Sequence, residues 1–275
     1  MPKVSIIIPV YKAEETIAAC LDSVTTQTLD NLEVLMVNDH TCDGSIDIAQ
    51  QHLKQYSGPI RFIFLETDTH GSPGAARNLG IEKATGDYLA FLDSDDTLDS
   101  VFCEKLYSAA IQEKADLAFG HISIDQADGY SVIKRNPPVT NGSFVGKAKQ
   151  QYLRQFISYF TTYLYRRDFL VKNNIRFPNT HSAEDSCFLI CSLLSAQRIT
   201  SIDKALYHYH VHALSISQKR DPQRWRNRLD SFRAMKQFAQ HNSLYRPYRN
   251  TINWIILKKG WLMAAKDFYK NNLKP

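Results

Sequence analysis

The feature that most constrains the fold is an alternation of apolar runs and helical patterns over the first 92 residues. The apolar runs lie at 3–10, 32–38, 60–65 and 88–92, and the helical patterns lie between them at about 15–26, 45–55 and 74–85. Strands that alternate with helices and read as nearly continuous apolar runs are typical of a parallel sheet covered on both faces. We therefore predict an α/β fold with a Rossmann-like, mostly parallel sheet.

The pattern is looser after residue 96. It comprises a helical pattern at about 100–114, short apolar segments near Leu117 and Ile122 that read as two strands, and a polar stretch at 125–146 with two prolines. We predict one domain over 1–218, divided into halves at 1–96 and 97–218. Mobile loops are expected in the second half.

Basic residues gather at the end of the chain. The net charge is +5, but the residues from Lys219 onward hold 14 Lys and Arg against 3 Asp, so this end carries +11 and the first 218 residues −6. Apolar side chains recur there at helical intervals, at Trp254, Leu257, Trp261, Ala264 and Phe268. We predict a basic helical extension over 219–275 whose apolar stripe packs on the domain. Contact with an anionic membrane surface is the alternative, and no nucleic-acid partner is expected.

Composition and cysteine usage narrow the class of protein. With 275 residues, 44% of them hydrophobic, the chain can bury a sizeable core. It has no apolar run of the roughly 20 residues that a membrane span needs, and its first residues lack the pattern of a signal peptide. Its five cysteines are scattered, which favours a reducing compartment, and Cys187 and Cys191 are expected to be core residues. We expect a cytoplasmic protein, with peripheral contact at the inner membrane surface as the alternative.

Chemically distinctive residues directly follow the predicted strands. In parallel sheets, ligands bind beyond the carboxyl ends of the strands. Those ends carry Pro9 and Tyr11 after the first strand, Asp39 after the second, and Asp93, Asp95 and Asp96 after the fourth. Four neighbouring carboxylates would repel one another, so we predict a bound divalent cation, Mn²⁺ or Mg²⁺, which favours oxygen ligands. The alternative is that Asp93 and Asp96 cap a helix that begins near Leu98.

Four motifs, in this order, resemble those of the inverting glycosyltransferase family 2, which has the GT-A fold. They are VSIIIPVY at 4–11 with Glu14 nearby, VNDHTCDGS at 37–45, GSPGAARNLG at 71–80 and FLDSDD at 91–96. The resemblance extends over nearly the first 217 residues. The sequence departs from the family pattern at Lys12, where Asn is common, at Asn38, where Asp is usual, and at His40 and Thr41, which replace Gly and Ser.

The resemblance implies roles for a donor site. The residues that match nucleotide-facing positions of the family are Pro9, Tyr11, Glu14 and Arg77. Asp39 would bind the base of the nucleotide. Asp93 would hold the ribose, and Asp95 would bind the metal and the diphosphate.

The pair Glu184 and Asp185 bears on the acceptor side. Both open an apolar helix at 187–194, where carboxylates would also stabilise the helix dipole. An inverting sugar transfer needs one carboxylate to take the proton of the attacking hydroxyl. The resemblance assigns this role of general base to the second residue of the pair, Asp185.

The segment YHYHVH at 207–212 matches the closing motif of the family, with His210 in the usual place of Arg. Alternation along a strand would put His208, His210 and His212 on one face. Some family members use a late histidine as a metal ligand. The resemblance therefore indicates His212, together with Asp95, as a metal ligand.

These features predict a metal-dependent enzyme that transfers a sugar, with inversion, from a nucleotide diphosphate sugar to an acceptor hydroxyl. The resemblance implies a UDP-sugar donor and a glycan or lipid-linked saccharide acceptor. A nucleotidyltransferase of sugar phosphates is one alternative, but the residues after the first strand lack the Gly-rich loop expected for a triphosphate. A non-catalytic nucleotide-sugar-binding module is the other alternative, and the presence of Asp185 argues against it.

Overall fold

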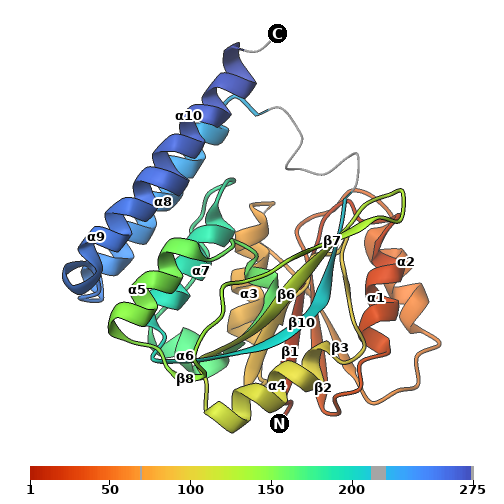
Figure 1. Ribbon diagram of the computed structural model, residues 1–275. Helices are drawn as coiled ribbons and strands as arrows, with labels where there is room; N and C mark the ends of the chain where they lie inside the picture. The colour runs from red at the N-terminus through yellow and green to blue at the C-terminus, as the bar shows by residue number, and fades with distance from the viewer. Residues whose placement is uncertain (69, 212–220, 274–275) are drawn as a thin grey trace.

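The apolar runs form the strands of one mixed sheet (Figure 1). The structure is a computed structural model that describes residues 1–68, 70–211 and 221–273. Within these residues, ten strands lie in the order β3-β2-β1-β4-β9-β6-β10-β5, with β7 beside β6 and β8 beside β10. The strands are β1 Val4–Val10, β2 Leu32–Asn38, β3 Arg61–Glu66, β4 Tyr88–Phe91, β5 Thr97–Leu98, β6 Leu117–Asp125, β7 Ser131–Lys134, β8 Gly142–Ser143, β9 Tyr163–Arg166 and β10 Arg198–His210. The helices are α1 Ile17–Thr25, α2 Ser45–Leu53, α3 Pro73–Lys83, α4 Phe102–Glu113, α5 Gly146–Gln155, α6 Arg167–Lys172, α7 Glu184–Ser195, α8 Arg224–His241, α9 Tyr245–Ile255 and α10 Leu262–Phe268.

The first half of the sheet is parallel. Strand β1 pairs in parallel with β2 and β4, and β2 pairs with β3. Helices cover both faces of strand β1. Ile6 and Ile8 pack in the core with α1 and α4 on one face, and Ile7 packs in the core with α3 on the other. The strands and helices predicted here agree with the structure to within two residues at each end. The α/β fold class is confirmed.

The second half of the sheet adds antiparallel pairs. Strand β9 runs antiparallel to both β4 and β6, so β6 and its parallel partner β10 point the same way as β1. The carboxyl ends of β1, β2, β4 and β10 therefore meet at one edge, the upper edge in Figure 1. This edge is where ligands bind in such folds.

One expectation and one alternative for this half were wrong. A single strand, β6, replaces the two short strands near Leu117 and Ile122. Gly120 lies between these two residues, and a Cβ there would lie 2.7 Å from the Lys204 carbonyl oxygen, so glycine permits the close approach of β10 within a continuous strand. The residues after Asp96 form β5, and the next helix begins at Phe102, so neither Asp93 nor Asp96 caps a helix near Leu98.

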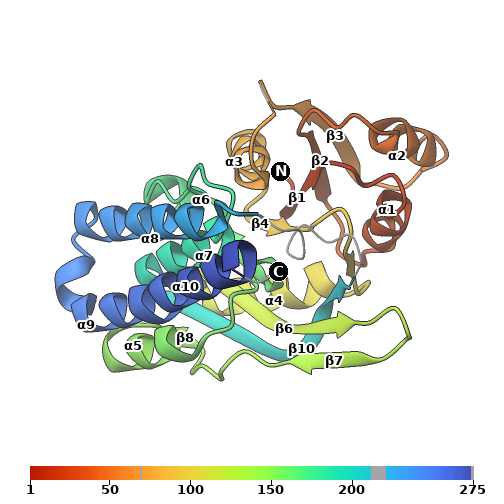
Figure 2. The ribbon, with the colours of Figure 1, turned by 90° about the horizontal axis from the view of Figure 1, so that it is seen from above.

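The extension forms two long antiparallel helices beside α7 and α5 (Figure 2). The first is α8, and the second runs from Tyr245 to Leu273 through α9 and α10, with wider π-helical turns at Ile256–Trp261 and Tyr269–Leu273. Ile252 and Ile255 are fully buried in the same core cluster as Phe232 of α8. The extension therefore packs on the domain.

The stripe predicted to make this contact is only partly the packed face of the helix. Ala264 is buried and Trp254 is partly buried, but Leu257, Trp261 and Phe268 are 52%, 56% and 41% exposed. The residues that pack instead include Ile252 and Ile255, which the predicted stripe leaves out. No helix in the described parts of the chain is long and apolar enough to cross a membrane.

Candidate active site

Asp39 directly follows β2 and is 3% exposed. Its Oδ1 accepts hydrogen bonds from the Gly71 N–H at 3.0 Å and from the Thr67 hydroxyl at 3.1 Å. Its Oδ2 lies 3.2 Å from Nδ1 of His70, whose ring stacks on Tyr11 with the ring centroids 4.7 Å apart. Two residues predicted to contact a nucleotide, Asp39 and Tyr11, thus share His70 as a neighbour. None of the sequence motifs described above includes His70.

Hydrogen bonds join the loops that follow β1 and β2. The Glu14 carboxylate accepts from the Gly44 N–H at 3.1 Å, and Asp43 accepts from the Glu14 N–H at 3.3 Å. The Thr41 hydroxyl accepts from the Lys12 N–H at 2.8 Å. Glu14 therefore holds the two loops together, and a contact with a nucleotide stays a prediction for this residue.

Two other predicted donor-site residues lie at the same edge. Pro9 pairs with Val37 one residue before the end of β1, and Asp95 is partly buried in the turn after β4. Their contacts with a nucleotide, a diphosphate or a metal stay predictions.

Arg77 links the two sides of the site. Its side chain is 7% exposed, its Nη2 donates to Asp93 Oδ1 at 2.6 Å, and its Nη1 lies 3.7 Å from Glu184 Oε1. The guanidinium also lies over the rings of Phe160 and Phe177, 4.7 and 5.4 Å from their centroids. Burial opposes the charge of Arg77, but Asp93 and Glu184 raise its pKa above the ordinary value. Arg77 is therefore a fixed positive charge between the carboxylates of β4 and α7.

Glu184 and Asp185 have raised pKa values. Burial raises the pKa of Glu184 to about 7, the nearby Asp185 raises it too, and Arg77 opposes the rise. Burial also raises the pKa of Asp185, against the Ser186 N–H that donates to its Oδ1 at 2.6 Å and against the charge of Arg77. Carboxyl groups with raised pKa values can take up a proton near neutral pH, as a general base must. Arg77 lies 3.7 Å from Glu184 and its charge acts on both carboxyl groups, so the choice of Asp185 for a reacting hydroxyl stays a prediction.

Asp96 points inward from this edge. It is 1% exposed, and it accepts hydrogen bonds from the Tyr207 hydroxyl at 2.6 Å and from the His210 N–H at 3.0 Å. Burial raises the pKa of Asp96, and the charges of Asp93 and Asp95 raise it further. The three carboxylates after β4 therefore act on one another electrostatically. Asp96 anchors β10 to this edge.

The three histidines of the closing motif, of which His212 is the predicted metal ligand, lie on or after β10 in sequence. Nδ1 of His208 is 2.9 Å from Asp125 Oδ2, and Nε2 of His210 is 2.8 Å from the Thr97 hydroxyl. His212 lies outside the described residues. In the described ranges, no group of three or more His, Cys, Asp or Glu side chains is arranged to hold a metal ion. A metal held by one or two carboxylates and by substrate phosphates does not need such a group.

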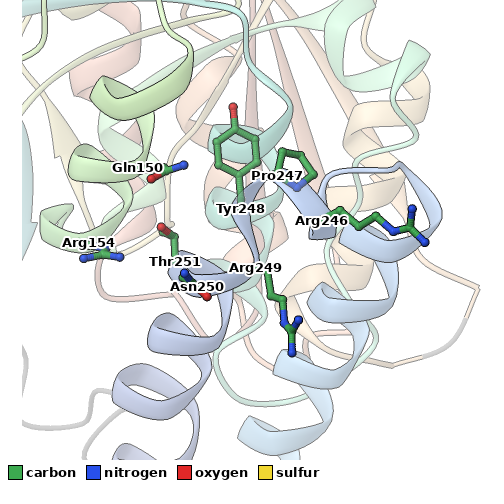
Figure 3. A pocket seen from close by; sticks show the side chains of 8 residues that line it. All are labelled: Gln150, Arg154, Arg246, Pro247, Tyr248, Arg249, Asn250 and Thr251. Carbon is green, nitrogen blue, oxygen red and sulfur yellow. The ribbon is translucent and has the colours of Figure 1, made fainter.

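Other candidate sites are less favourable. Cys187 and Cys191 are buried free thiols in the core, as predicted. A hollow of about 280 Å³ lies between α5 and α9 and shares no residue with the site above. Figure 3 shows that the guanidinium groups of its arginines, Arg154, Arg246 and Arg249, point in different directions, so they do not converge on one ligand.

Comparisons with known proteins identify a family and similar chains. The family model described as glycosyl transferase family 2 matches residues 5–188. A Bacillus subtilis (strain 168) protein named uncharacterized glycosyltransferase EpsJ is 32% identical over 223 residues, which cover 79% of this chain and 64% of that protein. The chain thus spans under two thirds of this relative.

Two solved structures share the fold. The crystal structure of S. aureus TarS 1-349 in complex with UDP-GlcNAc has a TM-score of 0.74 and 20% identity, covering 99% of this chain and 76% of that one. The mannosyltransferase PcManGT from Pyrobaculum calidifontis, in complex with GDP-Man and Mn²⁺, has a TM-score of 0.58 and 16% identity, covering 96% of this chain and 78% of that one.

Proposed function

The chain belongs to glycosyl transferase family 2, and we propose that it moves a sugar from a UDP-sugar to a hydroxyl of a glycan or lipid-linked saccharide, with inversion and with a divalent metal. The family makes it a glycosyltransferase; the donor, the acceptor, the stereochemistry and the metal are the proposal. A fold neighbour binds UDP-GlcNAc, which supports a uridine nucleotide as the donor group.

One observation carries the proposal. The guanidinium of Arg77 contacts Asp93 at 2.6 Å and lies 3.7 Å from Glu184. The carboxylates proposed to bind the donor and those proposed to act on the acceptor are therefore within the span of one side chain. A single displacement needs this closeness, because the acceptor oxygen must reach the anomeric carbon while the diphosphate is still attached.

We assign the donor site to the edge formed by β1, β2 and β4. Tyr11 and Asp39 would hold the base, with Pro9 and Glu14 shaping the nucleotide-facing loop. Asp93 would hold the ribose, in agreement with its position at the end of β4. The Thr67, Gly71 and His70 contacts of Asp39 hold its carboxylate in one orientation before ligand binds.

The carboxylates after β4 fit a metal ion. Asp93 and Asp95 both raise the pKa of buried Asp96, so a cation near Asp95 would relieve a repulsion already present. Mn²⁺ or Mg²⁺ bound by Asp95, with His212 as a second proposed ligand, would offset the charge that develops on the diphosphate as it leaves. A fold neighbour in complex with Mn²⁺ supports this choice of ion.

On the acceptor side, we assign the general base to Asp185. Its carboxylate would take the proton of the acceptor hydroxyl as the oxygen forms a bond to the anomeric carbon. The bond from that carbon to the diphosphate oxygen breaks at the same time, and UDP leaves. Attack from the face opposite the leaving group inverts the configuration at that carbon.

Binding of UDP with and without metal tests the donor site. UDP should raise the melting temperature more in Mn²⁺ or Mg²⁺ than in excess chelator, because a ligand of the native state stabilises it by mass action. Asp95→Ala should remove the difference between metal and chelator. Equal stabilisation in both conditions would contradict the metal assignment, and no stabilisation by any of UDP, GDP or TDP with metal would contradict the donor class.

We also propose that the last helix contacts an anionic membrane surface from the cytosolic side. Leu257, Trp261 and Tyr269 are more than half exposed, and Lys258 and Lys266 lie exposed beside them. Aromatic and aliphatic side chains flanked by lysines favour the surface of an anionic bilayer. All five cysteines are free thiols, which suits the reducing cytosol.

Vesicle sedimentation tests this contact. The double variant Leu257→Ala/Trp261→Ala should reduce binding to vesicles that contain phosphatidylglycerol, while Tyr130→Ala, which removes another exposed aromatic ring far from the extension in sequence, should not. Equal sedimentation of wild type and the double variant would contradict the proposal.

A further inference from the structure

The loop that carries the catalytic pair has an unusual backbone. Ala183, immediately before Glu184, has φ +62° and ψ +17° at the N-terminal end of α7. A left-handed conformation is strained for a residue with a Cβ, so it persists where surrounding contacts hold it. The question is which contacts hold this turn.

Two of them come from helix α8 of the extension, which packs beside α7 (Figure 2). Ser231 is fully buried, and its hydroxyl donates to the carbonyl oxygen of Ser182 at 2.7 Å. The same hydroxyl is hydrogen-bonded to the Thr180 hydroxyl. One side chain of the extension therefore holds the loop at two points, directly before the left-handed residue.

The extension also brings positive charge near the catalytic pair. Burial raises the pKa of Asp185, and the charge of Arg228, on the same helix as Ser231, opposes this rise. Arg228 is itself held by Asp267 on α10, with Nε 2.7 Å from Oδ2. Lys259, from the last helix, donates to the Ser158 hydroxyl at 2.7 Å. Burial lowers the pKa of Lys259, and the charge of Asp185 opposes this shift. Both helices of the extension therefore carry a positive charge that acts on Asp185.

We propose that Ser231 is a positioning residue for the transfer reaction: through Ser182 and Thr180 it holds the turn that directs Asp185 toward the acceptor. The inference rests on the proposed function, because it assumes that Asp185 is the base. It gives the extension a part in turnover, beyond its packing and its proposed contact with a membrane. The catalytic pair would then be fully ordered only when α8 is docked.

Ser231→Ala tests the inference, with Ser192→Ala as a matched control. Ser192 is also a fully buried helical serine, but its hydroxyl donates to the Phe188 carbonyl within α7, away from the loop. Ser231→Ala should speed hydrogen exchange of the amides of residues 181–186, and Ser192→Ala should not. It should also lower kcat for UDP release from UDP-GlcNAc by about 10-fold to 100-fold, the range expected for a displacement on the order of 1 Å. The KM for UDP-GlcNAc and the affinity for UDP should change less than twofold.

Thr180 offers a conservative pair. Thr180→Val removes the hydroxyl that meets Ser231, and Thr180→Ser keeps it. Thr180→Val should therefore lower kcat in the same direction as Ser231→Ala, and Thr180→Ser should retain most of it. In the Asp185→Asn background, adding Ser231→Ala should cost less than twofold, because the base through which it acts is already lost.

The outcomes separate the inference from the function on which it rests. Wild-type exchange at residues 181–186 in Ser231→Ala would overturn the inference. A wild-type kcat in Ser231→Ala, together with a lowered kcat in Asp185→Asn, would also overturn the inference. This result would leave the proposed function intact. Wild-type UDP release in Asp185→Asn would overturn the assignment of the base and the inference with it.

Discussion

The donor side and the acceptor side of the site are built in different ways. Asp39 is held by Thr67 and Gly71, which are 28 and 32 residues away in the segment between β3 and α3. The turn before Glu184 and Asp185 is held by Ser231 of the extension, and Glu184 itself faces Arg77 of α3. The part of the donor side around Asp39 is thus built within the first strands and helices, whereas the acceptor side needs contacts from both ends of the chain.

This difference separates two kinds of mutational effect. Changes on the donor side should alter nucleotide affinity, because they remove contacts made in the ground state. Changes on the acceptor side should alter turnover, because proton transfer takes place only in the reaction. The predictions below test this separation, from the largest expected effect to the smallest.

Asp185→Asn should lower turnover by about 10² to 10⁴ while UDP still binds, because the amide keeps the shape of the side chain but cannot accept the proton. Glu184→Gln should lose less. Single-turnover rates and UDP titrations would measure both effects. Near-normal turnover of Asp185→Asn, or a product that keeps the anomeric configuration of the donor, would rule out the proposed mechanism.

Ile255→Ala should destabilise the protein by about 2 to 5 kcal/mol, because it empties a fully buried position between the extension and the domain. Leu257→Ala, two residues along the same helix and 52% exposed, should change stability by less than about 0.5 kcal/mol. Urea unfolding would measure the free energies of unfolding. Equal effects of the two substitutions would show that the buried face of this helix is assigned wrongly.

Asp39→Ala should weaken UDP binding by about 1 to 3 kcal/mol, the cost of losing a buried hydrogen bond and leaving its partners unpaired. With donor at saturation, its turnover should stay within a few-fold of wild type. Calorimetric titration with UDP and Mn²⁺ would give the affinity. A large loss of turnover with unchanged affinity would reverse the roles assigned to the two sides.

The raised pKa of Glu184 makes stability depend on pH. The folded state holds a proton on Glu184 up to a pKa of about 7, whereas the unfolded chain releases it near the ordinary value of 4.5. The unfolded state therefore binds fewer protons in this window, and stability falls as pH rises from about 4.5 to about 7. Glu184→Gln should remove this fall, so its stability relative to wild type should increase by on the order of 2 kcal/mol between pH 5 and pH 8.

Melting curves of both proteins at the two pH values would check this. A difference between variant and wild type that does not change with pH would show that Glu184 is already ionised at pH 5 in the folded state.

The sequence alone predicted the parallel half of the sheet and the carboxylates at its edge. Polar residues follow the apolar runs of this half closely. Asp39 and Asp93 could therefore be assigned to the same edge from strand order alone. These contacts are local to successive strand and helix units, and the hydrophobic period reports them well. The roles of individual residues came from motif resemblance, not from this period.

Other features depended on the tertiary structure. The period of apolar residues could not show that Gly120 lies inside a strand, because the reason is a carbonyl of β10 more than 80 residues later. Nor could it show which face of the last helix is buried, because Ile252 and Ile255 and the aromatic stripe are both apolar and only the packing against α8 distinguishes them. His70 carried no motif signal, and its stacking on Tyr11 appears only when two loops meet.

The same limit explains the acceptor side. The sequence indicated Glu184 and Asp185 as a pair at a helix start, but it could not show that Arg77 divides them by pairing with Glu184, or that Ser231 holds their loop. Such contacts join residues that no periodic pattern relates, and they form only once the helices have packed. Local pattern determined the strands and the order of the motifs, and the packing of distant helices decided which side chains surround the two carboxylates.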